Sequence, residues 1–384
     1  MITKVISRLF NLAVNLFSFL IPVNNKLLLF GTHTGYYSDN SRFLMEYIKA
    51  NRNYRVYWVG EGKEMDFGNG TFIKRGSFKA NLYSLRASYI FFTHSYSDVS
   101  QYYNCRTVLV NLWHGSPTKK IGLDHTIFNN LRKSWLSKLL KRDFQKWHYF
   151  VISSTYWKSI FKSAYRFSDN QFICSGLPRI DYLTNSSINE QLKSRLCGDL
   201  NPDKILLYIP TYRQGVINSK SYDIVSGNIY SDLLLDKKLL DILEKNNYIL
   251  LVKMHPLEGS NILINNSRIK ILKDYRGLVE DLYLISDLMI TDYSSAIFDF
   301  STLFKPISLY IPDYKEMINS MGGFYFDYES CKEFEGFNIS KSKRELFAFI
   351  ENNEMTVDDD FYHEFNTKYI TNNASKNICK TLNI

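Results

Sequence analysis

The sequence predicts an α/β protein with two open, mostly parallel sheets, and three observations predict it. The chain has 384 residues, which is more than one hydrophobic core usually organises, so two domains are expected. Apolar residues make up 45% and charged residues 22% of the chain, which is the balance of a folded globular protein. Short β-branched or aromatic runs alternate with helical patterns, which is typical of parallel strands covered by helices on both faces.

Residues 1–22 predict an amphipathic helix. Polar residues interrupt the apolar run every three or four positions and would form one stripe on a helix: Lys4, Arg8, Asn11, Asn15 and Ser18. This pattern is typical of a helix that lies in a membrane interface, and packing on the protein's own core is the alternative. The interruptions argue against a membrane span, and no small-residue cleavage site marks a signal peptide.

The predicted strands then form two groups along the chain. The first group consists of 26–33, 54–60, 89–95, 107–115 and 149–154. After a polar segment the pattern restarts, with strands at 204–213, 248–256, 269–274, 288–295 and 306–312. The polar segment, around 183–203, has the composition of a linker and is the predicted join. Residues from about 351 to 382 are predicted to be helical and could cross back to the first domain.

Charge and cysteine content limit the possible partners. The formal net charge of +9 favours acidic partners, for which nucleic acid, anionic lipid and a phosphorylated substrate all qualify. The five cysteines show no CxxC spacing, which argues against a zinc site or a disulfide framework and predicts a reducing compartment. A basic stripe with interleaved aromatic residues is not visible, so a nucleic-acid or lipid-binding module without enzymatic activity is disfavoured.

Candidate site residues stand where predicted strands end, because ligands of open α/β sheets bind beyond the carboxyl ends of the strands. In the second domain these residues are Arg213, His255, and Ser294 with Ser295 after a strand that closes on Asp292. Guanidinium groups, imidazoles and the backbone N–H groups of a helix start all suit phosphate oxygens. Each also has a structural alternative, such as N-capping for the serines.

The first domain ends its strands in a similar way. His114 lies at the tip of 107–115, in the segment "LWHGSP", and Arg179 follows a strand in "GLPRIDYL". His33 and His94 also lie at strand ends; they could line a pocket, although hydrogen-bonded structural roles are favoured. Aspartate pairs with metal-binding spacing are missing from the strand ends, and the "DDD" at 358–360 is predicted to be solvated or capping.

Five segments, in this order and spacing, resemble the CDP-glycerol glycerophosphotransferase family of teichoic acid and capsule synthesis: "NLWHGSPTKKIG", "GLPRIDYL", "IPTYR", "VKMHP" and "ITDYSSAIFDF". The segment "GYYSDNSRFLMEYI" at 35–48 fits too, so the resemblance covers about 26–330. It implies the GT-B architecture, in which two Rossmann-like domains face a cleft. It also implies a peripheral protein at the cytosolic face of the membrane, with a polyprenyl-diphosphate-linked acceptor. The expected organisation is 1–22 as membrane helix, 23–190 as acceptor-side domain and 191–384 as donor domain.

The resemblance also implies roles for single residues. His114 matches the proposed general base, and His255 matches the second important histidine. The expected donor-binding residues are Arg179, Arg213, Asp292, Ser294 and Ser295. Lys119 and Lys120 are expected on the acceptor or membrane side, with a solvated basic turn as the alternative.

The implied reaction attacks phosphorus, because an acceptor hydroxyl displaces CMP from CDP-glycerol and leaves a phosphodiester. No metal or other cofactor is expected, since cationic side chains and a helix terminus would stabilise the charge. The chain lacks the extra N-terminal module of long polymerases, which predicts one or a few additions. Two alternatives stay open: a ribitol-phosphate transferase that uses CDP-ribitol, and a GT-B sugar transferase that uses a nucleotide sugar.

Overall fold

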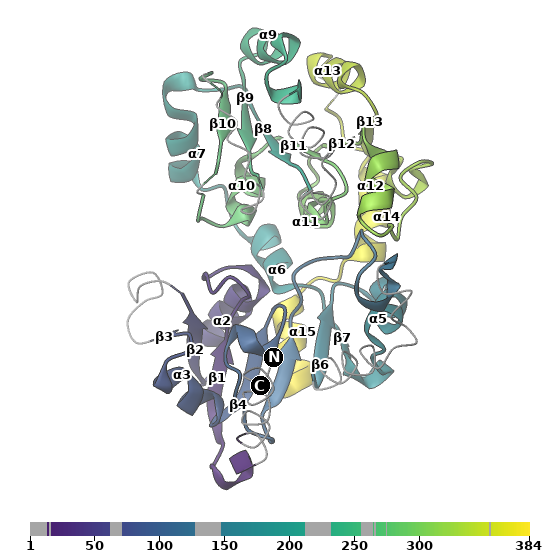
Figure 1. The fold of residues 1–384 in the computed structure, drawn as a ribbon. Coiled ribbons are helices and arrows are strands. Elements are labelled where there is room, and N and C mark those ends of the chain that lie inside the picture. Colours follow the sequence, from purple (N-terminus) through teal and green to yellow (C-terminus); the bar gives the residue numbers. More distant parts are fainter. Residues whose placement is uncertain are drawn as a thin grey trace, which may run out of the picture. The chain divides into compact units, whose positions relative to one another are not determined.

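The computed structural model describes residues 14, 17–61, 71–126, 147–211, 232–254, 264, 266–273, 275–352 and 355–384. Within these residues the chain forms two compact units, each with its own parallel sheet (Figure 1). The first unit comprises 1–114, 133–182 and 369–384, and the second comprises 115–132 and 183–368.

The first unit contains a sheet of seven described strands in the order β3-β2-β1-β4-β5-β6-β7. The strands are β1 (Asn24–Phe30), β2 (Arg55–Gly60), β3 (Phe72–Lys74), β4 (Ala87–Phe92), β5 (Val108–Asn111), β6 (Tyr149–Ile152) and β7 (Phe172–Cys174). All neighbouring pairs are parallel. The central strands are buried on both faces, as their continuous apolar runs predict.

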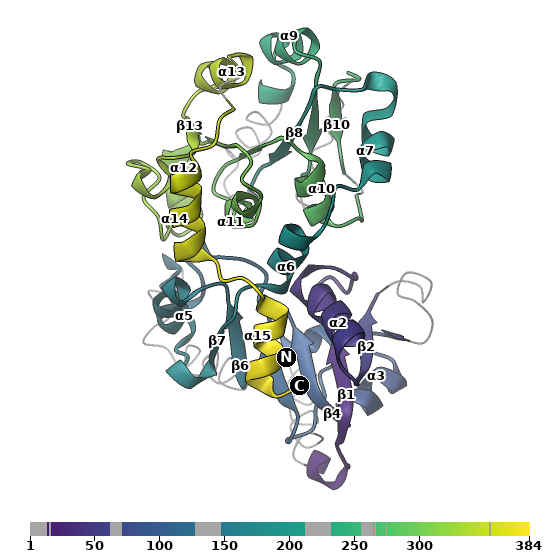
Figure 2. The ribbon, with the colours of Figure 1, turned by 180° about the vertical axis from the view of Figure 1, so that it is seen from behind.

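Helices of this unit include segments from both ends of the chain. They are α2 (Asp39–Asn51), α3 (Phe78–Ser84), α5 (Lys158–Tyr165) and α15 (Ala374–Leu382), and α6 (Pro178–Asn185) spans the change to the second unit. Figure 2 shows α15 beside α2, with which it packs. The carboxylate of Asp181 in α6 accepts hydrogen bonds from the backbone N–H groups of Ala374 and Ser375 at 2.8 Å each. These bonds hold the start of α15 in the first unit.

The second unit contains a sheet of six described strands in the order β10-β9-β8-β11-β12-β13. The strands are β8 (Lys204–Ile209), β9 (Tyr248–Val252), β10 (Ile269–Ile271), β11 (Leu288–Thr291), β12 (Ile307–Tyr310) and β13 (Asn338–Ser340). The helices are α7 (Glu190–Cys197), α9 (Lys237–Lys245), α10 (Val279–Ile285), α11 (Ala296–Phe300), α12 (Tyr314–Ser320) and α13 (Lys343–Glu351), while α14 (Asp359–Tyr369) leads back toward the first unit.

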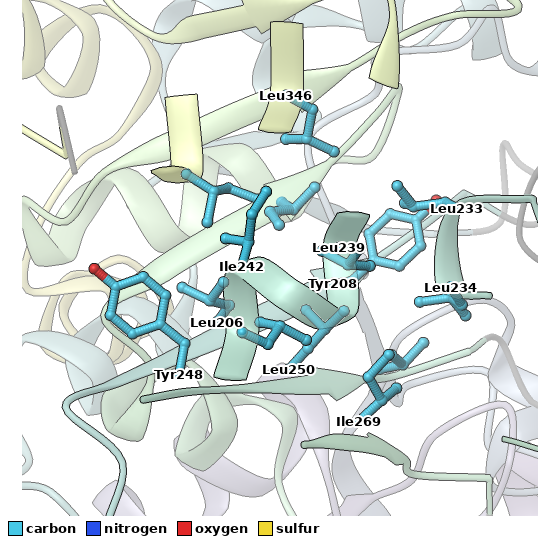
Figure 3. Close-up of a cluster of buried hydrophobic side chains, with 14 of the residues drawn as sticks. Leu206, Tyr208, Leu233, Leu234, Leu239, Ile242, Tyr248, Leu250, Ile269 and Leu346 are labelled. Carbon is cyan, nitrogen blue, oxygen red and sulfur yellow. The ribbon is translucent and has the colours of Figure 1, made fainter. Parts of the chain in front are cut away.

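A buried apolar cluster fixes β8 and β9 in this unit. Leu206 and Tyr208 of β8 and Leu250 of β9 pack against Leu239 and Ile242 of α9 (Figure 3). Each of these side chains is at most 2% exposed. The cluster therefore fixes the positions of the carboxyl ends of β8 and β9.

All ten strands expected from the sequence are present. Nine of them end earlier than expected, β2 ends at the expected Gly60, and three described strands were missed. The missed strands β3, β7 and β13 have three residues each, and such short runs give only a weak pattern. The unit boundaries also differ from the expected 23–190 and 191–384. Of the described residues, 115–126 fold with the second unit, and 369–384 return to the first.

The predicted amphipathic helix of residues 1–22 falls largely outside the described residues. Its last part is the 3₁₀ turn Ser18–Leu20, from which the chain runs into β1. Among the helices that the structure does describe, none has the length and apolar character that a membrane crossing requires.

Candidate active site

The sheet of the first unit reverses its strand order between β1 and β4. From β1 the sheet continues to β2 and β3 on one side, and from β4 it continues to β5 on the other. Such a reversal point is the expected ligand site of an open α/β sheet, at the carboxyl ends of the strands. Three histidines stand at this edge: His33 after β1, His94 after β4 and His114 after β5.

The three imidazoles form a stack. The rings of His94 and His114 are parallel within 4°, with centroids 4.0 Å apart. The rings of His33 and His94 are tilted by 34°, with centroids 4.8 Å apart. All three residues are exposed, so the stack offers imidazole edges to solvent at the strand ends.

Asp98 holds the middle of the stack. Its Oδ2 accepts hydrogen bonds from the backbone N–H groups of Thr93 at 3.2 Å, His94 at 2.9 Å and Ser95 at 3.4 Å. Its Oδ1 lies 3.9 Å from Nδ1 of His33. Asp98 is only 3% exposed, so one buried carboxylate fixes the backbone of the turn that carries His94.

The strand tip before His114 has an unusual backbone. Trp113 has φ of 53°, in the left-handed region that bulky residues rarely adopt. Two asparagines stabilise this turn. Oδ1 of Asn111 accepts from the Trp113 N–H at 2.7 Å, and the fully buried Asn40 donates from Nδ2 to the carbonyls of Trp113 at 2.9 Å and Leu112 at 3.3 Å. The turn is therefore held in the conformation that presents His114 at the sheet edge.

Arg179 reinforces the same turn. Its guanidinium Nη1 donates to the carbonyl oxygen of His114 at 2.7 Å and to Oδ1 of Asp39 at 3.1 Å. Its backbone N–H donates to Oδ1 of Asn40 at 3.2 Å. Arg179 is 5% exposed, so its described contacts favour positioning of His114 rather than phosphate binding. Its donor-binding role stays a prediction that this geometry does not support.

The contacts of His114 define its tautomer. Nδ1 lies 3.4 Å from the carbonyl oxygen of Thr93, and because a carbonyl only accepts, Nδ1 carries the hydrogen. Nε2 is then the unprotonated nitrogen. Desolvation by the surrounding protein lowers the pKa of His114 most, and His94 and Arg179 lower it further, against the hydrogen bond to Thr93. Since the residue is also exposed, water limits this lowering, but its direction keeps the ring neutral at neutral pH.

The second sheet reverses its order between β8 and β11, and Asp292 stands at that point. Its two carboxylate oxygens accept from the backbone N–H of Thr211 at 2.8 and 3.0 Å, which ties the end of β11 to the end of β8. Asp292 is 1% exposed. It therefore fixes the chain two residues before Arg213, and direct contact with a donor stays a prediction.

The serines after Asp292 begin a short helix. Oγ of Ser294 accepts from the N–H of Ala296 at 3.2 Å, while Ser295 is the N-cap residue and makes no side-chain cap bond. Both serines are half-buried, and α11 itself has five residues. Ser294 thus makes a local bond to the first residue of α11, and anion binding by this pair stays a prediction.

Lys119 and Lys120 pack within the second unit. Lys119 forms an antiparallel bridge with Phe324, and the N–H of Lys120 donates to the carbonyl of Gly323 at 3.0 Å. Oγ1 of Thr118 donates to the carbonyl of Tyr293 at 2.6 Å. These contacts place both lysines outside the first unit, to which the sequence interpretation assigned them, and their acceptor or membrane role stays a prediction.

The comparisons with known proteins agree with this arrangement of motifs. The family model described as CDP-Glycerol:Poly(glycerophosphate) glycerophosphotransferase matches residues 13–383. The chain belongs to this family. It is therefore a transferase of the glycerophosphotransferase class, as the sequence predicted.

Relatives within the family have several activities. A teichoic acid poly(glycerol phosphate) polymerase of Bacillus spizizenii is 32% identical over 86% of each chain. A teichoic acid glycerol-phosphate transferase of Staphylococcus aureus is 30% identical over 94% of each chain. A teichoic acid ribitol-phosphate primase of Bacillus spizizenii is 27% identical over 98% of this chain and 94% of its own.

Solved structures agree on the fold. The wall teichoic acid polymerase TagF matches with a TM-score of 0.77 at 22% identity, over 100% of this chain and 95% of that chain. A UDP-N-acetylglucosamine 2-epimerase matches with a TM-score of 0.55 at 11% identity, over 94% and 96%. The TagF-like fold with two parallel sheets is thereby shown.

The structure brings some of the predicted glycerophosphotransferase residues together and leaves others untested. His114 and Arg179 meet in the first unit, and Asp292 and Ser294 lie two residues apart between β11 and α11 of the second. Arg213 and His255 lie outside the described residues. The sequence interpretation missed Asn40, Asp39 and Asp98. The first two lie in the quoted segment 35–48 and could have been found there, whereas nothing in the sequence marks Asp98.

Proposed function

We propose that this glycerophosphotransferase moves glycerol phosphate from CDP-glycerol to an acceptor hydroxyl and releases CMP. The observation that supports the proposal most is the state of His114. Its ring is exposed at the carboxyl edge of the sheet, its Nδ1 faces a carbonyl, and its Nε2 is left to accept a proton. A neutral, positioned imidazole of this kind suits general base catalysis.

The chemistry then follows from the proton balance. His114 accepts the proton of the acceptor hydroxyl at Nε2 while the hydroxyl oxygen forms a bond to the β-phosphorus of the donor. The bond between that phosphorus and the oxygen bridging to CMP breaks, and CMP leaves with the electron pair. The positive charge on the imidazole is then held beside the Thr93 carbonyl, which accepts from Nδ1.

Donor binding is assigned to the second unit, again as a proposal. Arg213, His255, Ser294 and Ser295 would contact the pyrophosphate, and Asp292 would support them by anchoring Thr211. We also propose the GT-B architecture for the two units, because the family resemblance implies it. No metal is expected to be needed, and activity after dialysis against excess EDTA checks this expectation.

The decisive experiment is donor profiling with purified protein. CMP release is measured with CDP-glycerol, CDP-ribitol and nucleotide sugars, each with a soluble acceptor. We expect CDP-glycerol to be the best donor, because relatives named for glycerol phosphate have 30 to 32% identity. Preference for CDP-ribitol would instead place the chain with relatives such as the ribitol-phosphate primase. Turnover of a nucleotide sugar alone would contradict the proposed function.

The acceptor and the number of additions are further parts of the proposal. We propose a polyprenyl-diphosphate-linked saccharide or a growing polymer as acceptor. The expectation of one or a few additions rested on chain length, but the polymerase relative from Bacillus spizizenii aligns with this chain over 86% of both lengths. Chain length therefore does not distinguish one or a few additions from polymerisation. Mass spectrometry of products at excess donor measures the number of added units directly.

Peripheral attachment at the cytosolic face of the membrane is proposed from the amphipathic pattern of residues 1–22. Deletion of residues 2–21 should release the protein from anionic liposomes while activity on a short soluble acceptor survives. If the truncated protein still sediments with the vesicles, another surface mediates attachment.

A further inference from the structure

A cavity of about 350 Å³ lies in the first unit. We call it the α3 pocket; Glu61, Arg75, Asn81, Ser97, Val99 and Tyr102 are among its lining residues. Glu61 directly follows β2, Arg75 directly follows β3, and Ser97 lies in the turn after β4. The pocket therefore opens at the same carboxyl edge of the sheet as His33, His94 and His114, where ligands of such sheets bind.

The chemistry of the lining is that of a site for hydroxyl groups. Among the described lining residues there is one carboxylate, one guanidinium, amides, hydroxyls and a phenol, and Val99 is the only aliphatic side chain. The charges of Glu61 and Arg75 balance formally, so the described lining has no surplus of positive charge for a phosphate. Its mixed donors and acceptors match a neutral compound with many hydroxyl groups.

Two polar groups of the lining have unused hydrogen-bonding capacity. Nε of Arg75 is buried and has no partner in the part of the chain that the structure describes. Oδ1 of Asn81 accepts from Oγ of Ser100 at 3.0 Å, which orients the amide and leaves its NH₂ group without a described partner. Buried polar groups in native proteins usually have partners, so the buried Nε of Arg75 indicates a ligand or ordered water, and the half-buried amide of Asn81 offers a further donor beside it.

The pocket shares its walls with the candidate active site. The guanidinium of Arg75 donates to the carbonyl of Thr32 and, at 3.0 Å, to the carbonyl of His33. Ser97 and Val99 flank Asp98, the buried carboxylate that holds the His94 turn. A ligand in the pocket would therefore contact the two loops that carry His33 and His94.

We propose that the α3 pocket binds a neutral, hydroxyl-rich unit of the acceptor, either a saccharide or a polyol, next to the unit whose hydroxyl reacts at His114. The inference rests on the proposed function for the reaction itself. The volume, near the lower end for small-molecule sites, suits a single small unit rather than a long segment of polymer.

Two variants test the pocket without touching the histidine stack. Ser97→Trp fills the cavity from an exposed position, and Glu61→Gln removes the carboxylate charge while keeping its shape. The matched controls are Ser187→Trp and Glu335→Gln, at exposed positions of the second unit. The readouts are KM for the acceptor, KM for CDP-glycerol and calorimetric CDP-glycerol binding, with a soluble disaccharide and a short poly(glycerol phosphate) as separate acceptors.

We expect the acceptor KM to rise at least tenfold in Ser97→Trp and roughly tenfold in Glu61→Gln, because a charge-assisted hydrogen bond is weakened. Donor binding and both controls should match wild type. A rise confined to the disaccharide identifies a saccharide site, and one confined to the polyol phosphate identifies a polyol site. If wild type releases CMP with these acceptors but neither pocket variant changes their KM, the pocket proposal is wrong. If wild type itself gives no acceptor-dependent CMP release, the proposed function fails instead.

Discussion

The two sheets carry different side chains at the carboxyl edge where the strand order reverses. In the first unit, the edge between β1 and β4 presents exposed imidazoles, while buried Asp98 and Asn40 fix only the backbone behind them. In the second unit, the edge between β8 and β11 is closed by the buried carboxylate of Asp292, which bonds the backbone of Thr211. The first edge thus offers titratable side chains, whereas at the second edge a buried carboxylate fixes the strand end at Thr211.

This difference matches the proposed roles of the two edges, which are proton transfer at the first and donor binding at the second. An exposed imidazole such as that of His114, which faces the Thr93 carbonyl, suits proton transfer, because its pKa responds to small changes in the surroundings. At the second edge, Asp292 fixes the end of β8 at Thr211, two residues before Arg213, for which donor binding is proposed. Each prediction below tests whether one edge can be altered without altering the other.

The largest effect is expected for His114→Ala. Loss of a positioned proton acceptor should lower turnover by about 10²- to 10⁴-fold. Calorimetric binding of CDP-glycerol should be nearly unchanged, because the proposed donor residues belong to the second unit. If the variant instead loses donor affinity while its turnover at saturation stays near wild type, His114 is a binding or structural residue.

The next effect concerns Arg179. Arg179→Ala leaves the Asp39 carboxylate and the His114 carbonyl without their shared guanidinium partner. Removal of one member of such a largely buried pair should lower the free energy of unfolding by about 3 kcal/mol, measured by urea denaturation. Donor affinity should stay constant.

A double variant separates the stabilising ion pair of Arg179 with Asp39 from the predicted role of Arg179 in donor binding. Asp39→Ala combined with Arg179→Ala should recover part of the lost stability, because no unpaired carboxylate then remains. Loss of CDP-glycerol affinity in Arg179→Ala without loss of stability would support the original donor-binding prediction.

Smaller effects are expected at the second edge. Arg213→Ala or His255→Ala removes a charge-assisted bond to the donor phosphates, so CDP-glycerol binding should weaken by about 1.5 to 3 kcal/mol. Turnover falls as well if that bond strengthens in the transition state. Calorimetry beside steady-state CMP release measures both. Unchanged donor affinity in both variants would contradict the assignment of this edge to the donor.

The comparison also shows what the sequence could predict. The strands were predictable because their apolar runs are continuous, but each was predicted too long, since residues such as Thr32 and Thr93 continue a β-like pattern beyond the last ladder bond. The histidines at strand ends were predictable from the expected parallel topology.

The contacts of the supporting residues were harder to predict than the strands. Asn40 lies in the quoted segment 35–48, but its bonds reach carbonyls 72 and 73 residues away. Asp98 bonds nearby backbone N–H groups, which have no side-chain signature. The packing of residues 115–126 with the second unit had no local signal either. Thr118 bonds the carbonyl of Tyr293, 175 residues further along the chain, and no local pattern reports such a contact.

The smallest predicted effect is a shift in pH dependence on replacing His94. The proposed role of His114 as a neutral base predicts that kcat/KM falls as the pH drops through the pKa of His114. Desolvation, His94, Arg179 and His33 lower that pKa, and the Thr93 carbonyl raises it. Asp98 and Asp39 act on His94, whose own pKa is lowered mainly by desolvation.

His94→Ala admits water to the His114 ring and removes a neighbouring like charge, so both changes raise the pKa of His114 toward its ordinary value. The acid limb of the kcat/KM profile should therefore move to higher pH, by up to about one unit. His94→Phe keeps a flat ring at the 4.0 Å stacking position and should shift the limb less. His363→Ala, an exposed histidine of the second unit, is the control and should leave the profile unchanged. A shift of the acid limb to lower pH in His94→Ala would show that His94 does not lower the pKa of His114. The proposed explanation of why His114 is neutral would then be wrong.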